Sequence, residues 1–556
     1  METRGFLASG VAMEDIETIY LSELIGRWNE AVAGTSHPQP PVLFDKDIQI
    51  TDIVEHTDYV KSGSCFVARV RTESDGHPFI EKAVAKGASV IVGQRAIEEL
   101  DNQLVGVPYI QVEDSAIAEA WLSAAMFRFP SQHLTMIGVT GTDGKTTTTN
   151  IIYEMLRSAG IRSGMLSTIK ASIGDSEEPL ALHVTTPEAP IIQRYLREMV
   201  DAGLTHCVLE VTSHSLAQHR VDAIDFDLAV VTNISHEHLD YHGDYEGYFN
   251  AKASLFTGLD KPRWKLNSGK SEKGGVQKTA LLNLDDDSYE RLSQVVKAKL
   301  LAYAIHQDGD VLAGEIVYSP DRTRFNLHLP GIAGRNYLVE STLVGEFNVY
   351  NMLAAAGAGH ILGLSPEEIC RGIGAIDVLD GRMEQIKSGL EFQLMVDFAH
   401  TPNGLEKAIG AARAMTEGRI FTVFGSAGKR DVAKRRIMAE ISARDADFTI
   451  LTAEDPRTES LADILDMMAD GCRSQGGIEG KNFWRERDRG RAIYFAISLA
   501  QPNDLILVCG KGHEQSMCFN TTEYPWDDRQ AALSAIEAYL SGKPMINLGL
   551  PTFEDG

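Results

Sequence analysis

One stretch of the sequence has the residues to hold phosphate, 138-GVTGTDGKTTTT-149. It overlaps the apolar run LTMIGVT (134–140), which predicts a buried strand, and leads into TTTTNIIYEMLRSAG (146–160), whose apolar residues have helical spacing. A strand, a glycine turn and a helix start bring backbone N–H groups around an anion. We therefore expect Lys145 to contact the outer phosphates of a nucleotide and the Thr146 hydroxyl to bind Mg²⁺.

The glycine spacing of this loop differs from the common G-x-x-x-x-G-K-[ST] pattern, since its compact core is G-T-D-G-K-T. A glycine turn with a chance lysine is the alternative, and the flanking strand and helix argue against it. Thr147 is expected to face phosphate as well, whereas Thr148 and Thr149 are expected to cap or line the helix start.

Histidines are concentrated between residues 183 and 242, which suggests a metal. The HEH at 236–238 does not have the H-E-x-x-H spacing of a zinc protease, whereas Mg²⁺ prefers oxygen ligands and accepts one imidazole. Glu210 and His238 each follow a predicted buried strand, so we expect both beside a nucleotide-bound cation. A capping or core histidine is the alternative for His238.

The composition narrows the class of protein. A chain of 556 residues is too long for one core, and its formal charge of −26 argues against a nucleic-acid or anionic-membrane partner. Six scattered cysteines without a C-x-x-C pair favour reduced thiols. No apolar run is long enough to span a membrane, and no signal peptide is indicated. We expect a cytoplasmic, monomeric enzyme.

Three α/β blocks are expected, at residues 1–133, 134–380 and 381–556. The third repeats apolar strands that end directly in polar residues, as in FTILTAEDPR and DLILVCGKGHE. This pattern predicts a doubly wound parallel sheet with ligands beyond its carboxyl ends. The polar, glycine-rich segment 261–278 is expected to be a surface loop.

Ordered segments from about residue 50 to 540 resemble the Mur ligase family. They are the G-T-D-G-K-T loop, LEVTSHSLAQHRV, TNISHEHLDYHGDYEGYFNAKASLF and GEFNVYN. GRME, VDFAHTPNGLEKA, FGSAGKRD, DPRTE and GKGHE resemble the branch that extends a UDP-N-acetylmuramoyl dipeptide by a diamino acid. The resemblance implies a uridine-nucleotide domain (1–133), a central P-loop ATPase-type domain (134–380) and a Rossmann-like amino-acid domain (381–556).

The implied reaction is ATP-dependent, ADP-forming amide ligation through an acyl phosphate. Charge neutralisation and positioning would then dominate catalysis. The resemblance assigns catalytic and magnesium roles to Lys145, Thr146, Glu210, His238 and Lys252, the last of them carbamylated. An ordinary surface lysine is the alternative for Lys252.

The resemblance also implies three sets of binding residues. For ATP they are Gly141, Thr142, Asp143, Gly144, Lys145, Thr146, Thr147, Asn348, Asn351, Arg382 and Asp397. For the uridine nucleotide substrate they are Thr57, Thr185, Thr186, Ser213, Gln218 and Arg220. For the incoming diamino acid they are Arg430, Asp455, Arg457, Gly510 and Glu514.

Some positions depart from the family pattern. Asp143 stands where an asparagine is usual, Glu237 replaces an aspartate, and His56, Thr57 and Asp58 replace D-S-R near the uridine diphosphate. Loss of an arginine beside a pyrophosphate is a substantial change.

Asp455 is a further departure. Ligases that add meso-diaminopimelate typically have D-N-P-R here, and this chain keeps Arg457 but has Asp455 in place of the asparagine. An aspartate would repel a distal carboxylate by roughly 4 kcal/mol at 4 Å and an effective dielectric of 20, and Arg457 could pair with it. This favours lysine or ornithine. If Asp455 turned away, meso-diaminopimelate would be favoured instead.

Three other functions are compatible with parts of the sequence. A P-loop ATPase or kinase would explain residues 138–149 and Glu210, but not Lys252 or the strand ends of the last block. A catalytically silent Mur-like partner subunit would explain the divergence of the first block. A ligase acting on another carboxylate, similar to folylpolyglutamate synthase, is the remaining enzymatic alternative.

Overall fold

The computed structural model divides into two compact units. One comprises residues 1–235, 245–303 and 357–365, and the other residues 236–244, 304–356 and 366–556. The structure describes residues 18–41, 47–71, 74–100, 104, 106–168, 170–174, 176–179, 186–235, 239–261, 273, 275–319, 321–332, 336–376, 379–387 and 389–553. Within this described part, no helix combines the length and apolar character needed to cross a bilayer.

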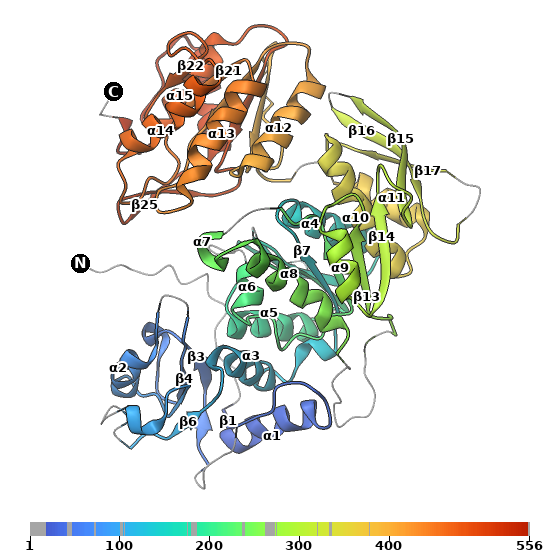
Figure 1. Ribbon diagram of the computed structural model, residues 1–556, viewed down its shortest axis with the longest axis vertical. Helices are drawn as coiled ribbons and strands as arrows, with labels where there is room; N and C mark the ends of the chain where they lie inside the picture. The colour runs from blue at the N-terminus through green and yellow to red at the C-terminus, as the bar shows by residue number, and fades with distance from the viewer. Residues whose placement is uncertain are drawn as a thin grey trace. The chain divides into compact units, whose positions relative to one another are not determined.

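The N-terminal part of the first unit is a parallel four-stranded sheet in the order β3-β4-β5-β6 (Figure 1). Its elements are β3 (Asp52–Val54), β4 (Ser64–Ala68), β5 (Val90–Gly93), β6 (Tyr109–Gln111), α1 (Leu21–Val32), α2 (Ile80–Ala85) and α3 (Ser115–Met126), with the short pair β1 (Ile19–Tyr20) and β2 (Gln49–Ile50). Alternate residues of β4 face opposite sides: Cys65 and Val67 pack with α1 and α3, and Phe66 and Ala68 with α2. Both faces are therefore covered.

The second sheet of this unit positions the phosphate loop. Its strands lie in the order β10-β9-β8-β11-β7-β12-β13-β14, parallel except at the β8-β9-β10 edge. The strands are β7 (Thr135–Thr140), β8 (Ser163–Leu166), β9 (Lys170–Ile173), β10 (Ser176–Pro179), β11 (His206–Glu210), β12 (Leu228–Val231), β13 (Thr279–Asn283) and β14 (Lys299–Ala304).

Helices cover this second sheet. They are α4 (Lys145–Ser158), α5 (Ala189–Asp201), α6 (Ser213–Ala217), α8 (Tyr245–Leu259) and α9 (Tyr289–Val295). Apolar residues of α5 and α8 pack in one core with Met136, Leu209 and Val231 of the sheet, and α4 lies against β7, β8 and β11. The strand at 134–140 and the helix after it are thus present as predicted.

The second unit contains an antiparallel meander and a larger sheet. The meander is β15 (Val311–Ser319), β16 (Arg322–His328) and β17 (Tyr337–Ser341), and the helices of this part are α7 (Leu239–His242), α10 (Glu346–Ile361) and α11 (Pro366–Gly374). Helix α11 packs on β17.

The larger sheet of this unit has the order β18-β19-β23-β20-β21-β22 and is parallel except at β18. Its strands are β18 (Glu384–Gln385), β19 (Gln393–Asp397), β20 (Ile420–Phe424), β21 (Phe448–Leu451), β22 (Phe483–Arg485) and β23 (Leu505–Cys509), followed by the hairpin β24 (Ser516–Phe519) and β25 (Thr522–Pro525). The four strands predicted to end in polar residues are β19, β20, β21 and β23.

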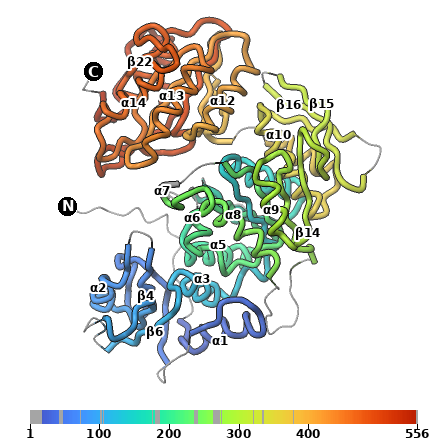
Figure 2. Tube along the Cα trace, viewed as in Figure 1, coloured from blue at the N-terminus to red at the C-terminus, as the bar shows by residue number. Residues whose placement is uncertain are grey.

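Helices of this sheet form two layers. They are α12 (Pro402–Met415), α13 (Val432–Asp445), α14 (Leu461–Ser474), α15 (Arg489–Leu499) and α16 (Asp528–Leu540). Helices α12, α13 and α14 lie side by side (Figures 1 and 2), and α15 packs with α16. The predicted α/β class with a doubly wound C-terminal sheet is therefore confirmed, while the boundaries after residues 133 and 380 stay predictions.

The segment 261–278 is only partly described. Within it Lys273 is buried and its ammonium lies 3.0 Å from Asp227 and 3.3 Å from Asp225. The expectation of a surface loop is therefore wrong at this residue, because two buried carboxylates pair with its charge.

Candidate active site

The phosphate loop joins β7 to α4 and depends on two glycines. Gly144 has a φ of 81°, and a Cβ atom on Gly141 would lie 1.8 Å from the Thr232 hydroxyl, so a side chain has no room there. The backbone N–H of Asp143 donates to Asn233 at 3.1 Å, and its carbonyl accepts from Thr232 at 2.5 Å. The side chains of Thr232 and Asn233 thus hold the backbone of the loop at the start of a helix, a position that suits an anion.

Side chains complete this loop. The Lys145 ammonium donates to the Thr142 carbonyl at 2.7 Å, and the Thr142 hydroxyl lies 2.9 Å from the Tyr248 hydroxyl. Lys145 is half-buried and Thr147 is buried. A lysine charge, glycine backbone and helix N-terminus therefore occur together.

Thr146 and Glu210 are brought together from different elements. The Thr146 hydroxyl lies 3.1 Å from both carboxylate oxygens of Glu210, which also accepts from the Thr168 backbone N–H at 2.9 Å. Both residues are buried. A hydroxyl and a carboxylate side by side fit the oxygen preference of Mg²⁺. His238 lies outside the described residues.

Lys252 of α8 is buried, at 1% exposure, so the surface-lysine alternative is excluded. Its ammonium donates to the Gly141 carbonyl at 2.6 Å and lies 4.7 Å from the centre of the Tyr248 ring. Lys252 therefore lies directly against the phosphate loop.

The predicted muramoyl contacts Thr186, Gln218 and Arg220 lie close together. The Arg220 guanidinium donates to the Thr186 carbonyl at 2.5 Å and to the Gln218 side chain at 2.6 Å, and the Thr186 hydroxyl donates to the Glu210 carbonyl at 3.1 Å. This group therefore adjoins the Thr146–Glu210 pair.

The other three predicted substrate contacts have different positions. Ser213 begins α6 and is buried, and Thr185 lies outside the described residues. Thr57 lies in the N-terminal sheet region, where its carbonyl accepts from Lys86 at 2.9 Å. No bond joins Thr57 to Thr186, Gln218 or Arg220 in the described part of the chain.

The predicted ATP contacts of the second unit occupy two places. Asn348 and Asn351 lie on α10 and are bonded to each other at 3.2 Å. Arg382 lies over the Phe398 ring at 4.6 Å, and the Asp397 carboxylate accepts from two backbone N–H groups at 2.7 Å, those of Met383 and Ala399.

His513 shares the surroundings of Arg382. Its ring centre lies 4.7 Å from that of Phe398, and burial, together with Arg382, Arg529 and Lys511, lowers the pKa of His513 to about 3. The imidazole is therefore neutral. A Cβ atom on Gly381 would lie 2.3 Å from the Gly512 carbonyl carbon, so two backbones touch here.

The predicted amino-acid loops contain strained backbone. Asp455 and Arg457 have φ of 39° and 53°, values that non-glycine residues seldom adopt. The Asp455 carboxylate accepts from the Lys511 ammonium at 3.0 Å and from the Cys518 N–H at 2.9 Å. The predicted partner of Asp455, Arg457, is thus replaced by Lys511, and no bond of the Arg457 guanidinium is found within the described ranges.

Glu514 and Gly510 lie beside this ion pair. Glu514 lies 2.5 Å from Lys511; burial opposes the charge of Lys511, but Glu514 and Asp455 outweigh it and raise its pKa. Gly510 has a φ of 111°, and a Cβ atom there would lie 2.2 Å from the buried Glu454 carboxylate.

A second ion pair, between Arg435 and Glu459, joins the loop at residues 427–430 to the loop at residues 455–459. The fully buried Arg435 lies 2.9 Å from the Glu459 carboxylate and donates to the Ala427 carbonyl at 3.3 Å, while Glu459 accepts from the Lys429 N–H. Arg430 itself is exposed. Sequence analysis did not select Lys511, Arg435 or Glu459, although Lys511 lies inside the GKGHE segment.

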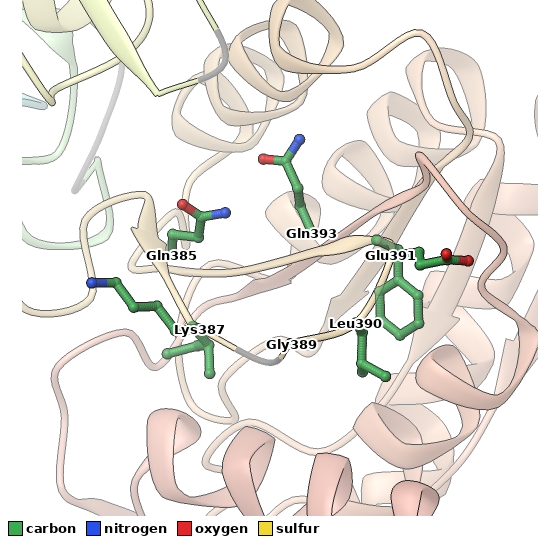
Figure 3. Close-up of a pocket in the computed structure, with 8 residues that line it drawn as sticks. Gln385, Lys387, Gly389, Leu390, Glu391 and Gln393 are labelled. Atoms are coloured by element: carbon green, nitrogen blue, oxygen red, sulfur yellow. The ribbon is translucent and has the colours of Figure 1, made fainter.

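A pocket of about 340 Å³ lies in the hairpin between β18 and β19 (Figure 3). Its polar lining residues are Gln385, Lys387, Glu391 and Gln393. In Figure 3 Lys387 and Glu391 point to opposite ends of the hairpin, so the pocket has no converging charges.

A glycine-lysine phosphate loop, a buried hydroxyl–carboxylate pair beside it and a further Rossmann-like sheet define an enzyme of the P-loop nucleotide-dependent type. The middle domain model of the Mur ligases matches residues 139–359, and the Mur ligase glutamate ligase domain matches residues 381–512. The chain belongs to the Mur ligase family, as the sequence motifs predicted.

Relatives and solved structures agree with this membership. The UDP-N-acetylmuramoyl-L-alanyl-D-glutamate–2,6-diaminopimelate ligase of Geobacillus kaustophilus is 39% identical over 86% of this chain and 93% of its own. The UDP-N-acetylmuramyl-tripeptide synthetase of Deinococcus radiodurans is 38% identical over 90% of this chain and 98% of its own. A solved diaminopimelate ligase of the same name as the first has a TM-score of 0.62 and 27% identity, over 94% of this chain and 99% of its own.

Proposed function

We propose that the chain adds meso-diaminopimelate to UDP-N-acetylmuramoyl-L-alanyl-D-glutamate at the expense of ATP, in the synthesis of peptidoglycan precursors. The observation that carries this proposal is the contact of Thr146 with Glu210 beside Lys145, next to the Thr186–Arg220 group. The names of relatives at 37–39% identity support the two substrates.

The chemistry requires activation, because a carboxylate does not accept an amine at neutral pH. ATP converts the γ-carboxylate of D-glutamate to an acyl phosphate, the amine attacks the acyl carbon, and the tetrahedral intermediate expels phosphate. Negative charge therefore builds up at the transferred phosphoryl group and then at the carbonyl oxygen. Lys145 and the backbone N–H groups at the start of α4 stabilise that charge.

Magnesium would be held by Thr146 and Glu210, with His238 as a further ligand, and it would neutralise phosphate charge. A carbamylated Lys252 would offer an anion in place of a cation on the same loop. The buried position of Lys252 against Gly141 supports this role. Asn348 and Asn351 would bind the adenine side, and Arg382 and Asp397 would contact the nucleotide.

The substrate carboxylates need cationic partners. Arg220 and Gln218, with Thr186, Thr185 and Ser213, would hold the muramoyl dipeptide, and Thr57 the uridine end. Arg457 and Arg430 would bind the distal carboxylate of the diamino acid, with Gly510 and Glu514 around its amino group.

The choice of meso-diaminopimelate follows from the state of Asp455. The preference for lysine or ornithine required an aspartate free to repel a carboxylate. Asp455 is instead engaged by the Lys511 ammonium and the Cys518 N–H, so its charge is compensated and the Arg457 guanidinium is left for the ligand. A compensated aspartate repels far less strongly than a free one.

We also propose that the enzyme is a cytoplasmic monomer. All six cysteines are free thiols, and four of them, Cys65, Cys207, Cys472 and Cys509, are buried, which suits a reducing compartment.

Phosphate release from ATP tests the function. It should require both the muramoyl dipeptide and the diamino acid. Release without either would indicate an ATPase, and no release under any condition a silent partner subunit. Binding of the uridine nucleotide distinguishes the enzyme from a ligase of another carboxylate, such as a folylpolyglutamate synthase; a solved example shares the fold at a TM-score of 0.54 and 16% identity.

A further inference from the structure

A cluster of buried and partly buried charges lies between the N-terminal sheet and the Thr186–Arg220 group, all within the first unit. We call it the glutamate–arginine cluster. It consists of Glu55, Glu119, Glu188, Arg69, Arg71 and Arg220.

Glu119 of α3 is the innermost member, with 0% exposure. Its Oε2 atom pairs with Arg69, which follows β4 and also lies 3.5 Å from Glu55. Arg71 lies 2.6 Å from the other oxygen of Glu55. These four residues are all contributed by the N-terminal block.

The same guanidinium groups reach the predicted substrate contacts. Arg69 Nη2 donates to the Gln218 carbonyl at 3.1 Å, and Arg71 lies 3.7 Å from Glu188. Glu188 in turn lies 2.9 Å from Arg220. Glu119 is therefore two contacts away from Gln218, through Arg69, and three from Arg220, which bonds to the Gln218 side chain, although about 100 residues separate them in sequence.

The carboxylates contain more acceptors than their partners satisfy. Glu119 Oε1, Glu55 Oε2 and Glu188 Oε2 accept no hydrogen bond, and one oxygen of each carboxylate lies within 4.8 Å of the others. Buried carboxylate oxygens without a donor are costly when they are charged. A proton on Glu119 would remove one negative charge from the three neighbouring carboxylates and so lower that cost.

A metal ion would satisfy the oxygens less well. Three guanidinium groups already lie among the three carboxylates, and they would repel a cation at contact distance. The cluster is therefore better suited to a proton than to a metal.

We propose that Glu119 is a positioning residue for the muramoyl-dipeptide pocket, which it holds through Arg69 and Gln218, and that it does so in its protonated form. This inference rests on the proposed function, because it takes Gln218 and Arg220 as contacts of that substrate. With Glu119 neutral, three guanidinium groups face two carboxylates, and the surplus positive charge favours an anionic ligand at Arg220.

The electrostatics of the site agree with this arrangement. Burial, and then the neighbouring Glu55, raise the pKa of Glu119 to about 8, despite Arg69. The charged and titratable groups around α3 are Asp52 of β3, Glu55 after it, Cys65 of β4, Arg69 after it, Glu188 before α5, Arg71, Arg220, and Arg27 of α1, which donates to the far end of α3.

The sign of the pH effect follows from the raised pKa. The folded state holds the Glu119 proton more tightly than the unfolded chain, whose pKa is near 4.5. The stabilisation from this proton is therefore full at low pH and is lost as pH rises toward 8. Substrate affinity should fall over the upper part of the same range.

Calorimetric binding of UDP-N-acetylmuramoyl-L-alanyl-D-glutamate, without ATP or amino acid, tests the proposal. Wild type should bind about fivefold more weakly at pH 9 than at pH 7, because ionisation of Glu119 adds one negative charge near the anionic ligand. Glu119→Gln, which mimics the neutral acid, should bind like wild type at pH 7 and keep that affinity at pH 9. Glu119→Ala, which removes the carboxyl group paired with Arg69, should bind the substrate more weakly at both pH values.

Glu23→Gln is the matched control, since Glu23 is an exposed carboxylate paired with Arg27 on α1. It should retain the pH response of wild type. Thermal unfolding gives an independent measurement: the Tm of Glu119→Gln should match that of wild type near pH 4, below the pKa of the unfolded chain, and exceed it increasingly between pH 6 and pH 9. This comparison stands even if Glu119→Ala fails to fold.

Three results would overturn the inference. They are a pH-independent affinity in wild type, an unchanged pH response in Glu119→Gln, and a loss of affinity in Glu119→Gln already at pH 7. The last would mean that Glu119 acts as an ionised partner of Arg69. Absence of binding at any pH would contradict the proposed function itself and thereby the inference that depends on it.

Discussion

The phosphate loop and the amino-acid loops achieve their shapes by different means. The loop at residues 141–147 is shaped by glycines, and the uncharged side chains of Thr232 and Asn233 hold its backbone. In the loops around Asp455 and Arg457, non-glycine residues have positive φ, and the charged side chains of Lys511 and Arg435 hold them. The shape of the first region therefore depends on glycine backbone, and the shape of the second depends on ion pairs.

The largest expected effect is on the phosphate loop. Lys145→Ala should lower kcat by about 10³-fold, because it removes a charge from the transferred phosphoryl group. Steady-state phosphate release measures this, with Lys170→Ala as the control, since Lys170 pairs with Glu177 on β10. Near-normal turnover of Lys145→Ala would show that the loop does not hold the reacting phosphate.

Lys252→Ala is expected to come next, with a loss of about 10²-fold in kcat if the lysine is a carbamylated support of the metal. Short carboxylates added to the buffer should restore part of the activity, because they can fill the vacated anionic position. Loss without any rescue would assign Lys252 to packing against Gly141, and full activity would remove it from the site.

Substitution of Arg435 addresses the amino-acid loops. Arg435→Met should raise KM for the diamino acid about tenfold and leave KM for ATP unchanged, because the two loops lose their common anchor. Arg444→Met on the same helix is the control, since Arg444 is exposed. An equal change in both KM values would contradict a separate, side-chain-held pocket.

The smallest effect is expected for Asp455→Asn. Removing one negative charge should raise kcat/KM for meso-diaminopimelate relative to lysine by about threefold, as for a partly exposed charge. Competition between the two amino acids in one assay measures the ratio. A shift toward lysine would contradict the pairing of Asp455 with Lys511 as the basis of selection.

Local pattern was sufficient to predict most of the fold and the phosphate side of the site. The apolar run LTMIGVT and the helical spacing after it predicted β7 and α4. The polar residues at the ends of apolar runs predicted the positions of Glu210 and Asp397 at strand ends. These features depend on neighbours in sequence, and parallel strands then gather them at one edge of a sheet.

Contacts between distant charges could not be predicted in this way. Lys511 and Asp455 are separated by 56 residues, and Glu119 lies in the alanine-rich helix SAIAEAWLSAAM, where a solvated position would be the ordinary expectation. The burial of Lys273 was not predicted for the same reason, since its partners Asp225 and Asp227 precede it by more than 45 residues. Sequence indicates that a charge is present, but only the folded chain determines its partner.

The contact between Gly381 and Gly512 has a consequence for how sequences of this protein can diverge. A single added carbon at Gly381 would occupy the space of the Gly512 backbone, 131 residues further along the chain. Neither glycine performs chemistry, yet a mutational survey should find Gly381 as intolerant of replacement as a residue that touches substrate. Intolerance at this position would therefore record a steric limit between two loops and should not be mistaken for a catalytic signature.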